Sequence, residues 1–243
     1  MIRTLALMIL SALPVFASAL DGKALLERVD RNLEPESYEM TRKLINEEPS
    51  GKRKEFILYS VKKGRDKVAA LFLAPASDKG RSTLRQGENM WLYIPNVGKP
   101  VRITSLQSVT GGVFNNADIL RVDYTEEYDV TEATESGDSY LLDLKAKTGA
   151  VAYDRLKLTV DRQTVLPTRI EAFAASGLLV KTLHFKDVKD FGEGIRRPAT
   201  IETDSPLYKG YKSVMLYAAV RNREVPDEVF TLNFMYRLDE LRK

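Results

Sequence analysis

Cysteine is absent from the 243-residue chain, and histidine occurs once, as His184. Without cysteine there is no disulfide, no thiol nucleophile and no cysteine-ligated metal. A zinc site built on one histidine would rely mostly on carboxylates, which is unusual for that metal. His184 lies in the segment 178–185, whose pattern is typical of a strand, so we interpret it as a structural residue. We therefore predict neither a metal nor a cofactor.

Motifs of nucleotide-binding and acyl-transfer enzymes are also missing. The chain contains no Gly-x-Ser-x-Gly, no Gly-x-Gly-x-x-Gly and no phosphate-loop pattern. An acidic group lacks the ligand spacing and central glycine of a calcium loop, and we interpret it as a solvent-exposed loop and strand face. It consists of Asp123, Glu126, Glu127, Asp129 and Glu132. These absences argue against an enzyme, and a hydrolase that uses carboxylates alone is the weakest alternative.

Charge of either sign is not in large excess. The chain has 37 Lys and Arg against 34 Asp and Glu, a net charge of +3, and without Arg3 the difference 36 − 34 leaves +2. No dense basic block of the kind that follows phosphates is present, so we exclude nucleic acid as a partner. The basic runs 52–54 and 62–63 flank turns, where we expect exposed charge. A weak attraction to anionic lipid head groups is compatible with this balance.

The longest apolar run, residues 5–16, is too short to cross a membrane. A membrane-spanning helix needs roughly 20 residues, and Pro14 interrupts this run. Arg3 precedes the run and the small residues 17–19 follow it, which is typical of a secretory signal peptide. We predict that residues 1–19 are a signal peptide that is removed on export to the periplasm.

Glycine-centred turn signals recur between short apolar runs along the rest of the chain. Leu156, Leu158 and Val160 alternate with polar residues, and a second alternating run follows at 166–172. We predict a hairpin at this place. Roughly a dozen strands of this kind, with no linker or composition break between them, indicate one domain over residues 20–243.

Two runs, 90–94 and 214–217, are apolar on both faces, so both sides of this part of the sheet must be covered or must line a space. Helices are predicted from Gly22 to Leu33, capped by Asp21, and near residue 116. The predicted fold class is mainly β, a strongly curved antiparallel sheet that forms an incomplete barrel covered by short helices. Its concave side is either filled by side chains or leaves a lipid-sized cavity.

Several segments form an ordered set along the chain. Segment 79–95 reads Lys-Gly-Arg-Ser-Thr-Leu-Arg-Gln-Gly-Glu-Asn-Met-Trp-Leu-Tyr-Ile-Pro and is followed by Arg102-Ile103 and by Gly-Val-Phe-Asn-Asn-Ala-Asp-Ile at 112–119. Later pieces are Tyr-Asp-Arg-Leu-Lys-Leu-Thr-Val-Asp at 153–161, Val-Leu-Pro-Thr-Arg-Ile-Glu at 165–171, Phe-Lys-Asp-Val at 185–188 and Val-Pro-Asp-Glu-Val-Phe-Thr at 225–231. In order and spacing this set resembles the outer-membrane lipoprotein-sorting family, the LolA-like periplasmic carriers. The likeness covers nearly all of residues 20–243.

The resemblance implies an incomplete barrel (LolA/LolB-like) with a helical lid and an apolar cavity that shields acyl chains, without enzymatic chemistry. The cavity candidates are Met90, Trp91, Leu92, Tyr93, Ile94, Leu156, Leu158, Met215, Tyr217, Phe230 and Phe234. An arginine tethers the lid in the sorting protein, and the candidates here are Arg85 and Arg102, with Phe114 in the lid loop. Around Phe114 the chain reads Gly-Gly-Val-Phe-Asn-Asn-Ala-Asp, which departs from the Ser-Asp-Phe type of sequence common in the family.

The function implied is a carrier or chaperone that binds lipid or lipoprotein acyl chains and helps to deliver them toward the outer membrane. The partners implied are an inner-membrane exporter of the resistance-nodulation-division (RND) type and an outer-membrane acceptor, and we expect a monomer. The alternative is a non-enzymatic sensor or interaction module of the same fold that binds mislocalised lipoproteins. Because the chain ends shortly after residue 241, we expect no second domain, which favours the carrier.

Overall fold

The computed structural model describes residues 20–242, so the predicted signal peptide lies outside the described residues. The strands are β1 (Ser37–Glu47), β2 (Arg53–Lys63), β3 (Lys67–Ala74), β4 (Ser82–Gln86), β5 (Asn89–Tyr93), β6 (Val101–Ile103), β7 (Tyr128–Ser136), β8 (Ser139–Ala146), β9 (Arg155–Asp161), β10 (Pro167–Phe173), β11 (Leu179–Asp190), β12 (Arg196–Asp204) and β13 (Lys212–Asn222). The helices are α1 (Gly22–Leu33), α2 (Asn116–Ile119), α3 (Tyr124–Glu127) and the 3-10 helices η1 (Asp227–Phe230) and η2 (Leu232–Arg242). None of the described helices is long and apolar enough to cross a membrane.

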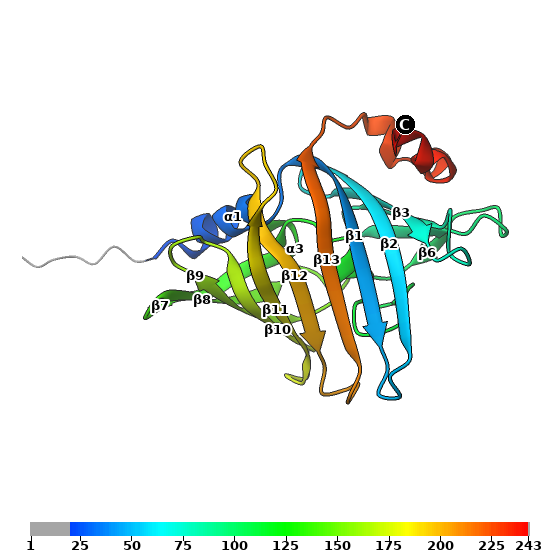
Figure 1. Ribbon diagram of the computed structural model, residues 1–243. Helices are drawn as coiled ribbons and strands as arrows, with labels where there is room; N and C mark the ends of the chain where they lie inside the picture. Colours follow the sequence, from blue (N-terminus) through cyan, green and yellow to red (C-terminus); the bar gives the residue numbers. More distant parts are fainter. Residues whose placement is uncertain (1–19, 243) are drawn as a thin grey trace, which may run out of the picture.

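All thirteen strands form one antiparallel sheet that bends strongly without closing (Figure 1). The order is β6-β5-β4-β3-β2-β1-β13-β12-β11-β10-β9-β8-β7. Two meanders thus meet at the centre of the sheet, where β1 pairs with β13. The predicted hairpin is the pair β9 and β10, and the predicted mainly β fold class is confirmed.

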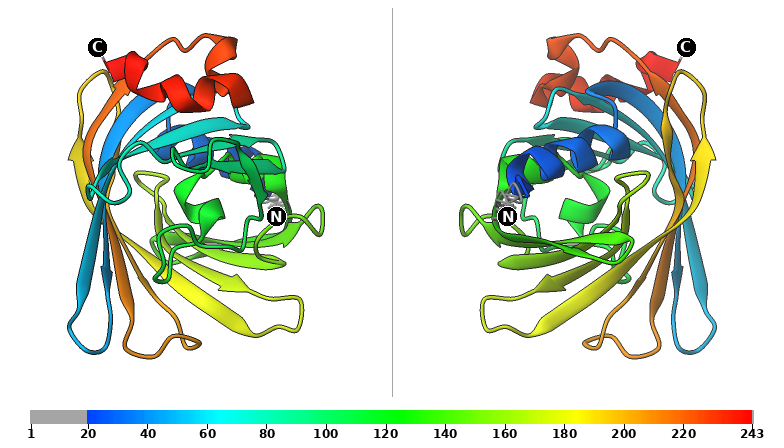
Figure 2. Two further views of the ribbon diagram at one scale, coloured as in Figure 1. Left: turned by 90° about the vertical axis from the view of Figure 1, so that its right-hand side faces the viewer. Right: turned by 90° about the vertical axis from the view of Figure 1, so that its left-hand side faces the viewer.

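The connection between the two meanders has to pass from one edge of the sheet to the other. Strand β6 ends at Ile103 and β7 begins at Tyr128, and these strands are the two outermost ones. The intervening residues 104–127 cross the concave side of the sheet and carry α2 and α3, which the bent sheet encloses (Figure 2). The strand order therefore places a covering segment over the concave face.

Helix α1 forms over the predicted residues and lies beside this covering segment. The Asp21 side chain caps it by accepting a hydrogen bond from the Ala24 amide at 3.0 Å. Its apolar stripe, which includes Leu26 and Val29, is buried. The helix ends at Leu33, and the next residue, Glu34, has an extended backbone because Pro35 follows and disfavours a helical conformation before it.

The sheet has an apolar cluster on each face. The concave cluster lies under α1, α2 and α3 and contains Met90 of β5, whereas Trp91 packs against the convex cluster, because successive side chains of a strand point to opposite faces. Helices η1 and η2 cover the convex side of β3, β4 and β5 (Figure 2). This arrangement explains the strand that is apolar on both faces at 90–94. In β13, Met215 and Tyr217 are buried on the concave face.

Candidate functional site

The segment that crosses the concave face, residues 104–127, is called the lid below. Its short helix α2 begins with a capping box: the Asn115 side chain accepts from the Asp118 amide at 3.1 Å, and the Asp118 carboxylate accepts from the Asn115 amide at 2.9 Å. The apolar side chains of the lid, which include Phe114, Ile119 and Leu120, are buried in the concave cluster. The lid is therefore an ordered cover with its own core contacts.

A small apolar hollow remains between the lid and strands β9 to β13. Its walls include Phe114, Ala117, Leu156, Ile170, Met215 and Tyr217. Burial raises the pKa of Tyr124, Tyr128 and Tyr153, which also face the hollow, so these side chains stay neutral. The space open to the centre of a water-sized sphere is about 40 Å³, and about 10 to 15 Å³ of such space holds one water. The hollow is therefore narrow, and the lid side chains occupy most of the space over this part of the sheet.

Five cationic side chains project from the concave face and are almost completely buried. They are Arg42 of β1, Lys62 of β2, Arg85 of β4, Lys181 of β11 and Arg197 of β12, with exposed fractions of 3%, 1%, 2%, 3% and 1%. We call them the concave cations. Charged side chains are rarely buried unless they are paired. The principal partners of all five lie on the lid or at the end of α1, as the following contacts show.

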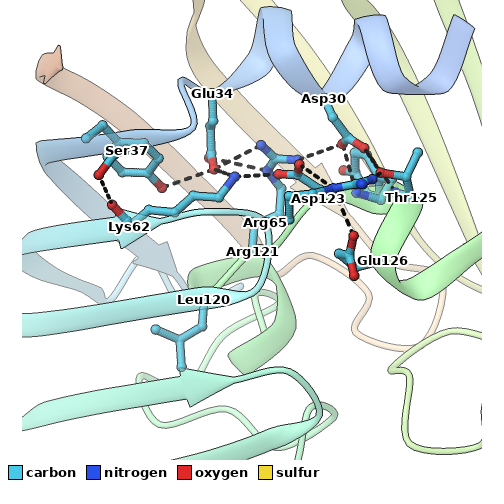
Figure 3. Close-up of polar contacts among 12 residues, drawn as sticks. Asp30, Glu34, Ser37, Lys62, Arg65, Leu120, Arg121, Asp123, Thr125 and Glu126 are labelled. Atoms are coloured by element: carbon cyan, nitrogen blue, oxygen red, sulfur yellow. Dashed lines mark hydrogen bonds and ion pairs between the residues drawn. The ribbon is translucent and has the colours of Figure 1, made fainter. Parts of the chain in front are cut away.

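Glu34, at the end of α1, is the centre of this network (Figure 3). Its carboxylate lies 3.0 Å from Arg121 of the lid, 3.7 Å from Lys62 and 3.6 Å from Arg197. It also accepts the hydroxyl hydrogen of Tyr38 at 3.0 Å. Burial alone would raise the pKa of Glu34, but the neighbouring cations outweigh burial and lower the pKa to about 2. The ionised Glu34 thus connects α1, the lid and the sheet.

Asp30, one turn earlier in α1, holds the start of α3 (Figure 3). Its carboxylate accepts hydrogen bonds from the backbone amides of Tyr124 and Thr125, at 2.8 and 3.0 Å. Asp123 precedes α3 but makes no side-chain capping hydrogen bond, so Asp30 satisfies these amides from another helix. Burial raises the pKa of Asp30, and Arg121 at 3.6 Å opposes this effect.

Arg42 and Arg85 bind the middle of the lid. Arg42 donates a hydrogen bond to the carbonyl of Ile119. Arg85 donates to the carbonyl of Leu120 at 3.1 Å and forms an ion pair with Glu127. These two carbonyls follow one another at the C-terminal end of α2, where backbone carbonyls lack partners within the helix. Two arginines from different strands therefore bind one turn of the lid.

Lys62 and Lys181 bind acidic side chains on either side of that turn. Lys62 lies 2.5 Å from the Asp123 carboxylate. Lys181 lies 2.7 Å from the Asp118 carboxylate and donates to the carbonyl of Val113 at 2.5 Å. The lid is thus joined to the sheet by charge at both ends of the segment 113–123.

Neutral groups hold the lid near the hairpin of β12 and β13. The Asn46 side chain donates to the carbonyls of Thr110 and Gly111 at 3.2 and 2.8 Å. It accepts from the Ser213 hydroxyl at 2.7 Å, and that hydroxyl accepts from the Val113 amide at 2.9 Å. We call this set of hydrogen bonds the latch.

Comparison with known proteins assigns this chain to a family. A family model described as "uncharacterized protein" matches residues 64–237. A crystal structure of a LolA superfamily protein from Nitrosomonas europaea is similar with a TM-score of 0.80 and 25% sequence identity, covering 89% of this chain and 100% of that one. The chain belongs to the LolA-like, outer-membrane lipoprotein-sorting family.

Two further structures share this LolA-like fold. A DUF1329 family protein from Desulfovibrio piger has a TM-score of 0.76 at 22% identity and covers 88% of this chain and 97% of its own. A domain described as an outer-membrane lipoprotein-sorting protein, from Vibrio parahaemolyticus, has a TM-score of 0.75 at 18% identity and covers 89% and 98%. No protein with a curated description matches the sequence significantly.

Part of the predicted cavity set lies on the concave side of this LolA-like sheet. Leu156, Met215 and Tyr217 line the hollow. Met90 and Leu158 belong to the concave cluster but do not reach the hollow. These positions follow from the alternation of their strands, which was visible in the sequence.

The other predicted cavity residues lie elsewhere, which corrects the sequence-based expectation. Trp91, Tyr93, Phe230 and Phe234 belong to the convex cluster, and the half-buried Leu92 and Ile94 lie outside both clusters. The physical reason is that η1 and η2 fold back over the convex face and bury apolar side chains there. Apolar character alone does not distinguish the two buried faces of one sheet.

Of the three residues predicted to tether or form the lid, two lie at the lid and one does not. Arg85 contacts the lid, and Phe114 belongs to it and lines the hollow. Arg102 lies over the ring of Trp91, at 5.2 Å from its centroid, on the opposite face from the lid. Within residues 20–242 it makes no hydrogen bond or ion pair to the lid. The expectation that Arg102 tethers the lid is therefore wrong for this conformation.

Replacing Arg85 and Arg102 separately compares these two candidates. Arg85→Gln leaves Glu127 and the Leu120 carbonyl without their partner, so we expect a loss of about 2 to 3 kcal/mol in the free energy of unfolding. Arg102→Gln removes only an exposed contact with a ring, and we expect a change below about 0.5 kcal/mol. Urea titrations followed by circular dichroism measure both. Equal effects would show that Arg85 does not hold the lid.

Sequence reasoning missed four of the five concave cations. Lys62 was interpreted as an exposed charge beside a turn, which is wrong because it is 1% exposed. A signal was present, since Lys62 falls on the same face of its strand as the buried Phe56 and Leu58. The same alternation places Arg42 in line with Met40 and Leu44. A cation in phase with an apolar stripe was the pattern to search for.

The acidic residues that the sequence analysis grouped between 123 and 132 have two different environments in the structure. Asp123 and Glu127 are partners of buried cations, which corrects their interpretation as solvent-exposed charge, whereas Glu126, Asp129 and Glu132 are exposed. His184 lies in β11, 3.0 Å from Asp204. Among the described residues, no group of three or more His, Asp or Glu side chains could hold a metal ion.

Proposed function

We propose that this LolA-like protein is a periplasmic carrier that binds the acyl chains of a lipid or lipoprotein and delivers them toward the outer membrane. The observation that carries the proposal is the apolar hollow between the bent sheet and a lid that the strand order places across it. The similarity to a LolA superfamily protein and to a lipoprotein-sorting domain supports it. The proposed activity is binding and release and has no covalent step.

The size of the hollow determines how such a carrier would work. We infer that this narrow space does not take a whole acyl chain while the lid lies as described. Cargo therefore has to displace the apolar side chains of the lid, such as Phe114, Ile119 and Leu120, from the concave cluster. Each buried methylene contributes about 0.8 kcal/mol, and the lost lid contacts oppose this gain. The binding free energy is then the difference between the apolar contacts that the cargo makes with the sheet and those that the lid gives up. Return of the lid to the sheet therefore promotes release of the cargo.

The proposal includes the route of the cargo. Residues 1–19 direct export to the periplasm, an RND-type exporter of the inner membrane supplies the lipid or lipoprotein, and an outer-membrane acceptor receives it. The carrier acts as a monomer, with one cargo molecule under one lid.

Mass spectrometry of co-purified lipid tests the proposal. The chain, expressed with its own leader in a Gram-negative host and purified without detergent, is expected to retain an acyl lipid at up to one molecule per protein. Ala172→Phe enlarges a β10 side chain that lines the hollow and stays on the sheet when the lid moves, and it should reduce retained lipid severalfold. Ala175→Phe, in the exposed turn after β10, is the control and should change nothing. Absence of lipid from the wild type, together with failure to bind an added fluorescent acyl probe, would refute the proposal.

A further inference from the structure

The charges around the hollow do not balance once the lid is considered separately. The buried network contains six cations, namely Arg42, Lys62, Arg85, Arg121, Lys181 and Arg197, and five acids, namely Asp30, Glu34, Asp118, Asp123 and Glu127. Arg121 and three of the acids belong to the lid, residues 104–127. Without the lid, the sheet and α1 keep five cations and two acids, a charge of 5 − 2 = +3. Moving the lid therefore exposes a strongly cationic surface.

Even with the lid in place, two of the concave cations have a buried N–H donor without a hydrogen-bond acceptor. Nε of Arg42 and one terminal guanidinium nitrogen of Arg197, Nη1, are buried and have no hydrogen-bond acceptor among the described residues. Arg197 meets Glu34 only at 3.6 Å and stacks on the Tyr217 ring at 3.9 Å from its centroid. Buried guanidinium groups normally have all their donors occupied. These two arginines thus have capacity for a further anionic acceptor.

The apolar hollow and the concave cations are adjacent. Met215 and Tyr217 form one wall of the hollow, and the same side chains contact Arg42, at 3.6 Å from the Met215 sulfur, and Arg197. On the lid side, Asp118 lines the hollow and is bound to Lys181. A molecule that takes the place of the lid would therefore meet an apolar surface over β9 to β11 and positive charge beside it.

We propose that the cargo is an amphiphile with an anionic headgroup, a phosphate or a carboxylate, which replaces the lid carboxylates as partner of the concave cations. This inference rests on the proposed carrier function and specifies its cargo. An anionic headgroup removes the penalty of leaving buried cations unpaired when the lid leaves. Arginine binds both phosphate and carboxylate through paired N–H donors. A neutral acyl lipid of equal chain length gives the same apolar contacts and leaves those cations without a partner.

A matched pair of probes tests the headgroup directly. cis-Parinaric acid is fluorescent and carries a carboxylate, and its methyl ester has the same chain without the charge. Titration of the full-length mature protein is expected to give at least tenfold tighter binding of the acid. Displacement of the acid by phosphatidylglycerol and by diacylglycerol then distinguishes phosphate from carboxylate: competition by phosphatidylglycerol alone identifies phosphate as an accepted headgroup, and competition by neither restricts the site to carboxylates.

Two variants link the preference to the concave cations. Lys181→Gln is expected to weaken binding of the acid at least fivefold and not to weaken binding of the ester, because the same change also removes a contact that holds the lid. Arg102→Gln removes a cation on the convex side and should change neither. Thermal unfolding of both variants reports whether Lys181→Gln folds, and the comparison of acid with ester in the wild type is valid whether or not it does.

The outcomes separate the two proposals. Tight binding of the acid with loss in Lys181→Gln supports the anionic cargo. Equal binding of acid and ester, or tighter binding of the ester, overturns the anionic headgroup and leaves the carrier function intact. An equal change in the binding of both probes by Lys181→Gln would show that this lysine does not distinguish the headgroups and would overturn its assignment to the headgroup. Binding of neither probe, nor of any competitor lipid, overturns the carrier function as well.

Discussion

Replacing Glu34 by glutamine is expected to lower the free energy of unfolding by about 3 to 5 kcal/mol. The substitution keeps the shape of the side chain and removes the charge that faces Arg121, Lys62 and Arg197 in a fully buried position. Breaking a buried ion pair from one side leaves uncompensated charge inside the protein, which is why the loss exceeds that of a surface pair. Urea denaturation monitored by circular dichroism measures the change.

Glu36 provides the matched control for this prediction. It lies two residues further along the same segment, is exposed, and makes no ion pair within residues 20–242. Glu36→Gln is expected to change the free energy of unfolding by less than about 0.5 kcal/mol. Similar stabilities of the Glu34 and Glu36 variants would mean that the network does not contribute to the fold.

The pH dependence of stability gives an independent measure of the same carboxylate. The folded pKa of Glu34 is about 2, against an ordinary value of 4.5. A lowered folded pKa stabilises the protein above pH 4.5, and this stabilisation is lost as the pH falls from 4.5 toward 2. The difference of about 2.5 units corresponds to about 3 kcal/mol. In Glu34→Gln this part of the acid destabilisation should be missing, so the stability profile should be flatter between pH 5 and pH 2.

Asp30 contributes with the opposite sign and at higher pH. Its folded pKa is raised from 3.8, chiefly by burial. A raised folded pKa gives a contribution that is present below pH 3.8 and is lost as the pH rises through the folded value. Below pH 3.8 the Asp30 contribution is constant, so the difference in slope between wild type and Glu34→Gln in that range reports Glu34.

The sequence contained enough information for the outline of the fold because local signals decided it. Asp21 and the stripe around Leu26 predicted α1 with its bounds, and the alternation at Leu156 and Leu158 predicted β9 and its buried face. Both patterns depend on residues within one or two turns of each other in the sequence. The curved sheet and the family followed from these local patterns and from the ordered set of segments.

The site could be predicted only in part because its partners are distant in sequence. Lys62 is buried because Asp123 and Glu34 reach it from a different segment and a different helix. Trp91 faces away from the hollow because the C-terminal η2 returns to cover the convex face. Alternation can assign residues to two faces, but only the long-range arrangement of lid and C-terminal segment determines which face encloses the hollow and which charges are neutralised there.

Locking the lid with a disulfide is expected to abolish uptake of an acyl probe. The latch holds the lid near Gly112, where a Cβ atom would lie 2.4 Å from Cγ of Asn46. Cysteines at these two positions are therefore within reach of a disulfide after small local shifts. The chain has no other cysteine, so no competing disulfide can form. If cargo has to displace the lid, the oxidised double variant Asn46→Cys/Gly112→Cys should take up cis-parinaric acid at least tenfold more slowly than the reduced one.

The single variants and reduction provide the controls. Gly112 has φ +78°, a conformation that costs other residues about 1 to 2 kcal/mol, so Gly112→Cys alone loosens the lid somewhat. Asn46→Cys alone removes the hydrogen bonds to Thr110 and Gly111 and acts in the same direction. Both single variants should take up the probe at least as fast as the wild type, and dithiothreitol should restore uptake to the oxidised double variant. Fast uptake with the disulfide intact would show that cargo reaches the sheet without displacing this end of the lid, and exchange of lid for cargo on the concave face would then be the wrong mechanism.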